Sequence, residues 1–217
     1  MQAGMCPNPP HADEYAVRFD HRRGARVLVI PALFDEANKL RHFTVEMMRK
    51  LDAAGVDSML PDLPGTNESL APLTEQSLDS WRAAMTSAAQ VFGATHCLTV
   101  RGGALCAPHS VPVLHYAPMA GAGLLRGMIR ARVLADREAG HETSSEVLKA
   151  EGAQSGLQLA GYQLGADMFR QLSASTVTKS DIAQNELGGP GLWLRAEPDH
   201  DPAQAEKLAQ LVVERLS

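Results

Sequence analysis

Short apolar segments alternate with amphipathic segments along the first half of this chain, and this alternation restricts the fold more than any other feature. Inner strands are predicted at 26–32, 56–60 and 97–100, and the first of these is apolar on both faces, as in a covered parallel sheet. Between them, the spacing of apolar residues predicts helices ending near Ala54 and Phe92, each followed by a glycine. Strands that alternate with helices form right-handed βαβ units. The sequence therefore predicts an α/β fold with a mostly parallel sheet of about six strands.

The second half of the chain does not continue the alternation of strands and helices. The remaining strands are expected over 15–19, as a half-buried edge strand, and over 111–116 and 191–196. From Pro118 onward helices are predicted over 121–139 and 144–172 with no clear strand, a longer stretch than one crossover connection needs. A closing helix is expected over 202–216. We therefore expect a helical insertion at 118–187 between late strands of the sheet.

Length, charge and cysteine content limit the class of protein. The 217 residues suffice for one α/β domain with a sizeable core, so 1–217 is expected to be a single domain. The net charge of −5 argues against a nucleic-acid-binding surface. The longest apolar run, at 27–34, is too short to cross a bilayer, and the first residues carry no apolar signal core. Three cysteines without a C-x-x-C pair favour a reducing compartment, so we expect a cytoplasmic protein with no membrane span.

The segment 99–103 has the spacing of a nucleophile turn but lacks the nucleophile. In α/β-hydrolases the motif G-x-S-x-G joins a strand to a helix and lifts a serine above the sheet. Here Thr99 stands at the first glycine position, Gly103 at the last, and Arg101 at the serine position. A guanidinium stays protonated and has no lone pair with which to attack a carbonyl carbon. The sequence therefore predicts the hydrolase fold more strongly than it predicts hydrolysis.

Several segments in consistent order resemble one family, the second type of exosortase A system-associated hydrolase. They are RVLVIPALFDEANKLRH, LPDLPGTNES, VRGGALCA, LLRGMIRARVL and LQLAGYQLGADMFRQL, and they cover most of 26–172. The resemblance implies a truncated α/β-hydrolase fold with a helical lid at 118–187. It also implies an arginine in place of the serine in the nucleophile turn at 99–103, which we call the elbow. It also implies a genomic link to exopolysaccharide production and protein sorting in Gram-negative bacteria, but no established substrate. This chain departs from the family pattern at Thr99, where the pattern has glycine, and in its short C-terminus.

Other candidate catalytic groups each have a structural alternative. Cys106 is expected in a helix that faces the core, where a free cysteine behaves as a small hydrophobe. Asp199 stands where this fold commonly places its acid, but Asp199 and Asp201 also suit the cap of the closing helix. His200 is the last histidine of the chain, so the late catalytic histidine of the fold is missing unless His200 swings into the site. We favour capping for the acids and a solvated loop position for His200.

The oxyanion corner of the fold is expected to survive around Arg101. Phe34 and Asp35, after the strand at 26–32, and Gly102, after the elbow, stand where the anion-binding groups would lie. Two alternatives remain open: Arg101 binds an anion or a carboxylate, or it forms an ion pair with an acid of the same chain. The candidate acids are Asp35, Glu36 and Asp62. A buried arginine without a partner would cost several kcal/mol, so we expect an acidic partner in either case.

The helix at 121–139 combines an apolar stripe with Arg126, Arg130 and Arg137 at near-helical spacing. Such a cationic face is most often a solvated surface, and Asp136 and a neighbouring glutamate reduce its charge. The alternative is contact with an acidic saccharide, a nucleotide or anionic lipid headgroups.

The leading hypothesis is a catalytically degenerate α/β-hydrolase-like protein that binds or regulates, with an anionic small molecule or a pathway protein as its partner. One alternative is a hydrolase or transferase in which Arg101 clamps a carboxylate or phosphate and Asp199 acts as the base. Another is a module that forms homodimers through 121–140. No histidines have the spacing of a zinc site, so neither a metal nor a cofactor is expected. Catalytic activity is expected to be absent rather than present.

Overall fold

The chain is built around a six-stranded sheet. The computed structural model describes residues 1–7, 13–177 and 179–216. The strands are β1 (Gln2–Cys6), β2 (Glu14–Phe19), β3 (Arg26–Ile30), β4 (Asp57–Pro61), β5 (His96–Val100) and β6 (Val113–Tyr116), in the spatial order β1-β2-β4-β3-β5-β6. Strands β4, β3, β5 and β6 are parallel, and β1 and β2 extend the sheet antiparallel beside β4. The predicted α/β class with a mostly parallel sheet is confirmed.

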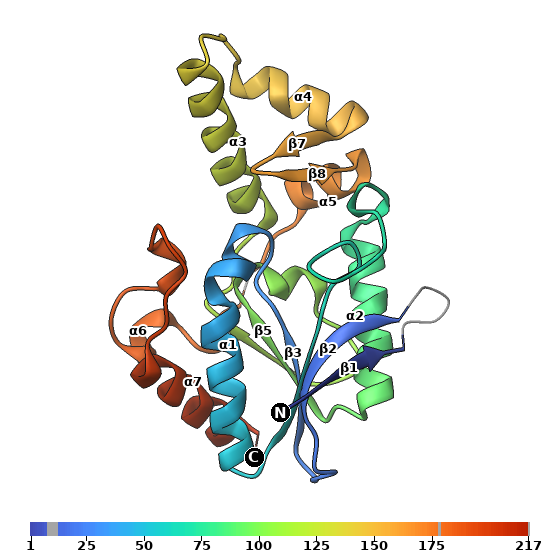
Figure 1. The fold of residues 1–217 in the computed structure, drawn as a ribbon, viewed down its shortest axis with the longest axis vertical. Coiled ribbons are helices and arrows are strands. Elements are labelled where there is room, and N and C mark those ends of the chain that lie inside the picture. The colour runs from blue at the N-terminus through green and yellow to red at the C-terminus, as the bar shows by residue number, and fades with distance from the viewer. Residues whose placement is uncertain (8–12, 178, 217) are drawn as a thin grey trace.

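Helices cover both faces of this sheet (Figure 1). On one face, α1 (Asp35–Ala53) packs against α7 (Pro202–Arg215), and on the other face lies α2 (Leu78–Phe92). Successive residues of a strand point to opposite faces, so β3 contributes to two separate cores. Val27 and Val29 pack with α1 and α7, whereas Leu28 and Ile30 pack with α2. Each inner strand must therefore be apolar on both faces, which is the pattern that the sequence shows in β3.

The predicted helices of the sheet region form where local signals place them. Helix α2 starts at the cap Ser77, whose side chain accepts a hydrogen bond from the Ser80 amide, and ends at Gly93 with φ 65°. Helix α7 starts at Asp201, whose carboxylate accepts hydrogen bonds from the backbone amides of Ala203 and Gln204. Asp201 therefore caps a helix, as the sequence indicated.

A second group of elements lies beyond the C-terminal ends of the parallel strands (Figure 1). We call it the α3–α5 unit; it spans 121–174. It consists of α3 (Gly121–Glu138), α4 (Ser145–Ser155), the antiparallel hairpin β7 (Leu157–Leu159) and β8 (Tyr162–Leu164), and α5 (Ala166–Ala174). Helices α3, α4 and α5 contact one another, and α3 and α4 also contact β7. Short segments complete the chain: η1 (Leu73–Glu75), η2 (Arg101–Cys106), α6 (Gln184–Leu187) and η3 (Leu192–Leu194).

The expectation of a continuous helix over 144–172 is wrong. The helix ends at Gly156, whose φ of 82° is unfavourable for other residues, and the hairpin β7–β8 follows. The hairpin turns at Ala160 and Gly161, with φ 49° and 85°, the positive pair that a tight two-residue turn requires. Strands of three residues are too short to show a period, so the sequence pattern did not reveal them.

Two expectations about the edges of the sheet are also wrong. The segment 15–19 is not an edge strand, because β1 pairs along the outer side of β2. The segment 191–196 contains the short 3-10 helix η3 in place of a strand, and Leu194 is 73% exposed. The position beside β6 is taken by Ile182, which forms an isolated bridge with Tyr116. A strand at 191–196 therefore has no free sheet edge at β6 to join.

Within the described ranges, none of the helices is both long enough and apolar enough to cross a membrane.

Candidate functional site

Three neighbouring strands of the sheet are followed by backbone turns of the same unusual kind. After β3, β5 and β6 the chain passes through Phe34, Arg101 and Ala117, with φ values of 57°, 54° and 43°. A positive φ at a residue other than glycine costs on the order of 1 kcal/mol and persists only where the surrounding structure fixes it. Such residues cluster at functional sites. The strained turns at these adjacent strand ends mark this edge of the sheet as the candidate site.

Arg101 links these three strand ends. Its Nε and Nη2 donate to the two carboxylate oxygens of Glu36, each at 3.0 Å, and its Nη1 donates to the carbonyl oxygen of Ala117 at 2.8 Å. Glu36 lies in the first turn of α1, two residues after Phe34. Arg101 is only 6% exposed, so this two-pronged ion pair is largely removed from water. Glu36 supplies the acidic partner that burial of Arg101 requires.

The face of the guanidinium is covered as well. Cζ of Arg101 lies 4.0 Å from the centre of the Trp193 ring, which comes from η3. Trp193 also contacts Tyr116 edge-on, with ring centres 6.2 Å apart. A cation above an indole ring is stabilised by the negative face of that ring. Arg101 is therefore held by oxygen atoms in its plane and by an aromatic ring on its face.

The two glycines after Arg101 allow η2 to pack against the end of β3. A Cβ atom on Gly103 would lie 2.3 Å from the Pro31 carbonyl oxygen, and one on Gly102 would lie 3.1 Å from Leu33. The Gly103 contact is with backbone, so a larger residue there would displace the elbow. At Gly102 the contact is with a side chain, and Leu33 would have to shift. The sequence R-G-G therefore fixes the position from which Arg101 reaches Glu36.

A cavity of about 400 Å³ lies against this ion pair. Phe34, Asp35, Glu36 and Arg101 line it, so the structure brings together three of the four residues expected to form the anion-binding corner. The fourth, Gly102, is buried and does not line the cavity. Most of the remaining wall is apolar, and Asp35 forms its own ion pair with Lys39 at 2.9 Å. The charged groups of the corner therefore already have partners within the chain.

The structure does not bring Asp199 or His200 to Arg101. Asp199 forms an ion pair with Arg195 and accepts a hydrogen bond from the His200 amide at 2.7 Å. The His200 ring stacks on that of His42, with ring centres 4.2 Å apart. Neither Asp199 nor His200 lines the cavity beside Arg101. The candidate acid and histidine are thus engaged with other residues.

Cys97 and Cys106 do not supply a nucleophile. Cys106 is fully buried, and burial raises the pKa of its thiol to about 12. Burial also raises the pKa of Cys97 far above the usual range of a thiol. The reactive form of cysteine is the thiolate, which such pKa values suppress at neutral pH. Among the described residues, no three His, Cys, Asp or Glu side chains are arranged to hold a metal ion.

Sequence reasoning missed a hydroxyl–imidazole pair below the elbow. Oγ1 of Thr99 lies 2.7 Å from Nδ1 of His115, and these two residues are register partners of β5 and β6. Burial lowers the pKa of His115, which favours a neutral imidazole. Thr99 is fully buried within β5, so a substrate cannot reach its hydroxyl. Finding this pair requires the strand register, which the sequence alone does not give.

Two solved structures have a fold similar to that of this chain. The chain is similar to alpha/beta hydrolase domain-containing protein 10 from mouse, with 14% identity, a TM-score of 0.50, and coverage of 79% of this chain and 69% of that one. It is similar to a putative hydrolase from Agrobacterium vitis S4, with 13% identity, a TM-score of 0.53, and coverage of 80% and 70%. Neither the protein-family models nor the curated protein sequences include a match. At these identities the similarity concerns the fold, and this chain has an α/β-hydrolase-like fold.

Proposed function

We propose that this protein is a catalytically degenerate α/β-hydrolase-like protein that binds a ligand or a partner without hydrolysing it. The observation that carries the proposal is the ion pair of Arg101 with Glu36 at the position of the missing serine. An arginine there has no nucleophilic lone pair, and three of its five N–H donors are already used by Glu36 and the Ala117 carbonyl. The elbow thus has a structural role in this chain.

The α3–α5 unit, within the insertion at 118–187, is the proposed lid. Leu124 and Met128 on α3 line the cavity beside Arg101, so this unit forms part of the cavity wall. The cavity is mostly apolar, which suits binding of a small molecule or a protein side chain better than charge-driven capture. Movement of α3 would change access to it.

The proposed pathway is exopolysaccharide production and its associated protein sorting. Support for it comes from the resemblance of five ordered segments to exosortase A system-associated hydrolases. A strain that lacks this protein should produce less exopolysaccharide. The Arg101→Met/Glu36→Leu variant, which removes both charges of the buried pair together, should restore production if the role is not catalytic. Unchanged exopolysaccharide yield in the deletion strain would contradict this part of the proposal.

A hydrolase or transferase that uses Arg101 as an anion clamp and Asp199 as a base is less well supported. Glu36 occupies two prongs of the guanidinium, and Arg195 holds Asp199. A substrate carboxylate would have to displace Glu36, which is tethered in the same chain and loses less entropy on pairing.

Hydrolysis assays with p-nitrophenyl esters and thioesters of different chain lengths test the proposal directly. We expect the purified protein to match buffer alone and to match the Arg101→Ala and Asp199→Ala variants. Turnover that either substitution abolishes would overturn catalytic degeneracy. Turnover that both variants retain and that further purification removes would point to a contaminating esterase.

A further inference from the structure

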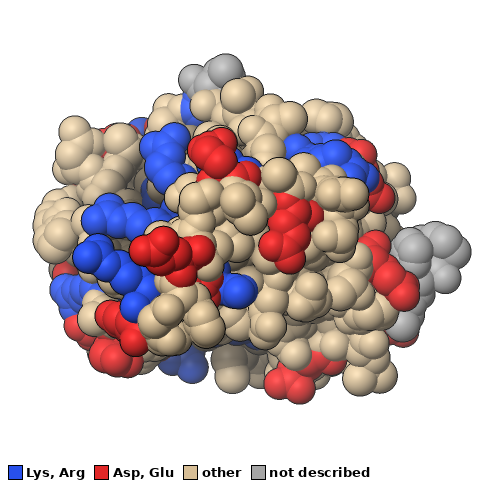
Figure 2. Space-filling view, turned by 90° about the horizontal axis from the view of Figure 1, so that it is seen from above, with Lys and Arg blue, Asp and Glu red and all other residues tan. Residues whose placement is uncertain are grey.

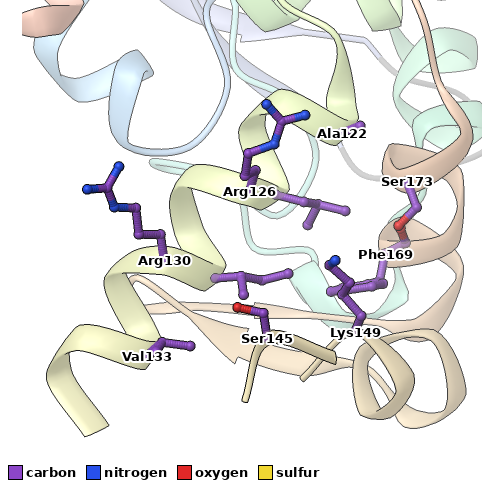
Figure 3. Close-up of a pocket in the computed structure, with 10 residues that line it drawn as sticks. Ala122, Arg126, Arg130, Val133, Ser145, Lys149, Phe169 and Ser173 are labelled. Carbon is purple, nitrogen blue, oxygen red and sulfur yellow. The ribbon is translucent and has the colours of Figure 1, made fainter. Parts of the chain in front are cut away.

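A second cavity lies on the other side of α3, away from Arg101. It has a volume of about 540 Å³ and is formed by α3, α4 and α5 of the α3–α5 unit. Figure 3 shows Arg126 and Arg130 on α3, Lys149 on α4, and Phe169 across from α3 on α5. We call this cavity the α3–α5 groove. Its size lies within the range of pockets that hold small molecules.

The floor of the groove is apolar. It is formed by Leu125, Ile129, Val133 and Phe169. Apart from Val133, each of these residues is less than 5% exposed. Helix α4 fits closely against the Phe169 ring, because a Cβ atom on Gly152 would lie 2.4 Å from that ring. Ser145 and Ser173 also line the groove and supply two hydroxyl groups. A sugar or a nucleobase on the apolar floor would still leave most of its polar groups without hydrogen-bond partners, which is unfavourable.

The rim of the groove is cationic. Arg126, Arg130 and Lys149 line it, whereas no Asp or Glu does. Figure 2, which looks onto the α3–α5 unit from above, shows several Lys and Arg side chains on the left of this face and a smaller group at the upper right, with Asp and Glu side chains beside them. Within the described part of the chain, Arg126 and Arg130 make no ion pair, and Lys149 has only an exposed pair with Glu146. An exposed pair of this kind contributes little and exchanges easily.

The two arginines also repel each other. Arg126 and Arg130 stand four residues apart on α3, where like charges are neighbours and destabilise the helix. Two other arginines of the α3–α5 unit differ, because Arg132 pairs with Asp136 and Arg170 pairs with Asp167. Arg137 makes no ion pair among the described residues either, but it does not line the groove. A bound anion at the rim would relieve the repulsion that the chain itself leaves uncompensated.

We propose that the α3–α5 groove binds a single-chain amphiphilic anion, with its alkyl chain on the apolar floor and its carboxylate at the Arg126–Arg130 rim. The apolar floor favours the alkyl chain of the ligand. The cationic rim, which no Asp or Glu lines, favours its negative charge. The groove is separated from the Arg101–Glu36 pair by α3, so the proposal does not depend on whether the elbow is catalytically inert.

Isothermal titration calorimetry with the full chain and sodium octanoate tests the proposal. Octanoate should bind, and hexanoate should bind about tenfold more weakly because it buries two fewer methylene groups. Octan-1-ol should bind several-fold more weakly because it lacks the charge. The double variant Arg126→Gln/Arg130→Gln should lose about fivefold or more in octanoate affinity.

The matched control is the double variant Arg132→Gln/Arg137→Gln, which removes the same charge from the same helix outside the groove. It should change octanoate affinity by less than about twofold. A groove variant that keeps every charge, Ala122→Phe, should weaken octanoate binding by filling the groove.

Each of the following results would overturn the proposal. These are equal affinity for octanoate and octan-1-ol, equal affinity for octanoate and inorganic phosphate, equal losses in the two double variants, and no octanoate binding. Binding to phosphatidylglycerol vesicles without binding to octanoate would indicate a membrane-surface role and would also overturn it. Circular dichroism of each variant separates a loss of the site from a loss of folding.

Discussion

The two cavities beside α3 differ in the burial and pairing of their arginines. On one side, Arg101 is buried and satisfied by Glu36, the Ala117 carbonyl and Trp193. On the other side, Arg126 and Arg130 are exposed at the rim of an apolar groove. A buried charge must find its partners within the chain, because no water solvates it. An exposed charge remains solvated until a ligand arrives, so it can serve a binding site.

The two cavities therefore differ in whether their charged groups can bind a ligand. The corner beside Arg101 has the position of a hydrolase active site, but its charges are neutralised internally. The α3–α5 groove has no place in the catalytic geometry of the elbow, yet its charges are available. Helix α3 separates the two, with Leu124 and Met128 facing one cavity and Leu125 and Ile129 facing the other.

The largest effect is expected when Glu36 is removed. The Glu36→Ala variant leaves Arg101 buried without its carboxylate, and the free energy of unfolding should fall by about 3 kcal/mol. Guanidinium chloride unfolding measures the change. The control is Asp35→Ala, which removes an exposed partner of Lys39 and should change the free energy of unfolding by less than about 0.5 kcal/mol. Equal losses in the two variants would show that Arg101 does not depend on Glu36.

A double replacement should restore most of that loss. In Arg101→Met/Glu36→Leu both charges are replaced by apolar side chains, and buried ion pairs are often no more stabilising than such replacements. We expect the double variant to unfold within about 1 kcal/mol of the native chain, well above Glu36→Leu alone. A double-mutant cycle from chemical unfolding gives the coupling. Additive losses would mean that the two side chains act independently.

A smaller effect is expected at Trp193. Its ring covers the Arg101 guanidinium and contacts Tyr116, so Trp193→Leu should lower the free energy of unfolding by about 1 kcal/mol. Trp193→Phe keeps an aromatic face and should lose less. The decisive measurement is the Trp193→Leu loss in an Arg101→Met background, where the cation is absent. If the loss is the same in both backgrounds, the cation contributes nothing to the contact.

Local sequence signals predicted most of the fold. The helices that became α1, α2 and α7 follow apolar periodicity. Their ends carry local signals that act within a few residues: a capping side chain starts α2 and α7, and a glycine follows α1 and α2. Features that depend on distant partners were missed or wrong. The strand expected over 191–196 did not form, since Ile182 bridges to Tyr116 at that edge of the sheet. Strand β1 was missed because its short segment is recognisable only through its pairing with β2.

The candidate site was predictable in position but not in partners. The turn spacing placed Arg101 at the crest of the sheet and offered three acids. Geometry selects among them: Asp35 pairs with Lys39, and Asp62 accepts hydrogen bonds from Arg41 at 3.0 Å and Asn67 at 2.8 Å. Glu36 is the acid that meets Arg101, because the strained turn at Phe34 starts α1 beside the elbow. The contact of the Trp193 ring with the Arg101 guanidinium was missed because the segment 191–196 was expected to be a strand.

The smallest effect is expected at the rim of the groove, and its sign is opposite to that at the elbow. In the absence of a ligand, Arg126→Gln/Arg130→Gln removes a like-charge pair and should raise the free energy of unfolding by about 0.3 kcal/mol at low salt. Salt should diminish the gain, because it screens exposed charges. The control Arg132→Gln/Arg137→Gln removes an ion pair with Asp136 and a cation from the last turn of α3, so it should lower stability. A loss of stability in the rim variant would show that the chain itself uses these arginines, and the contrast with Arg101 would then disappear.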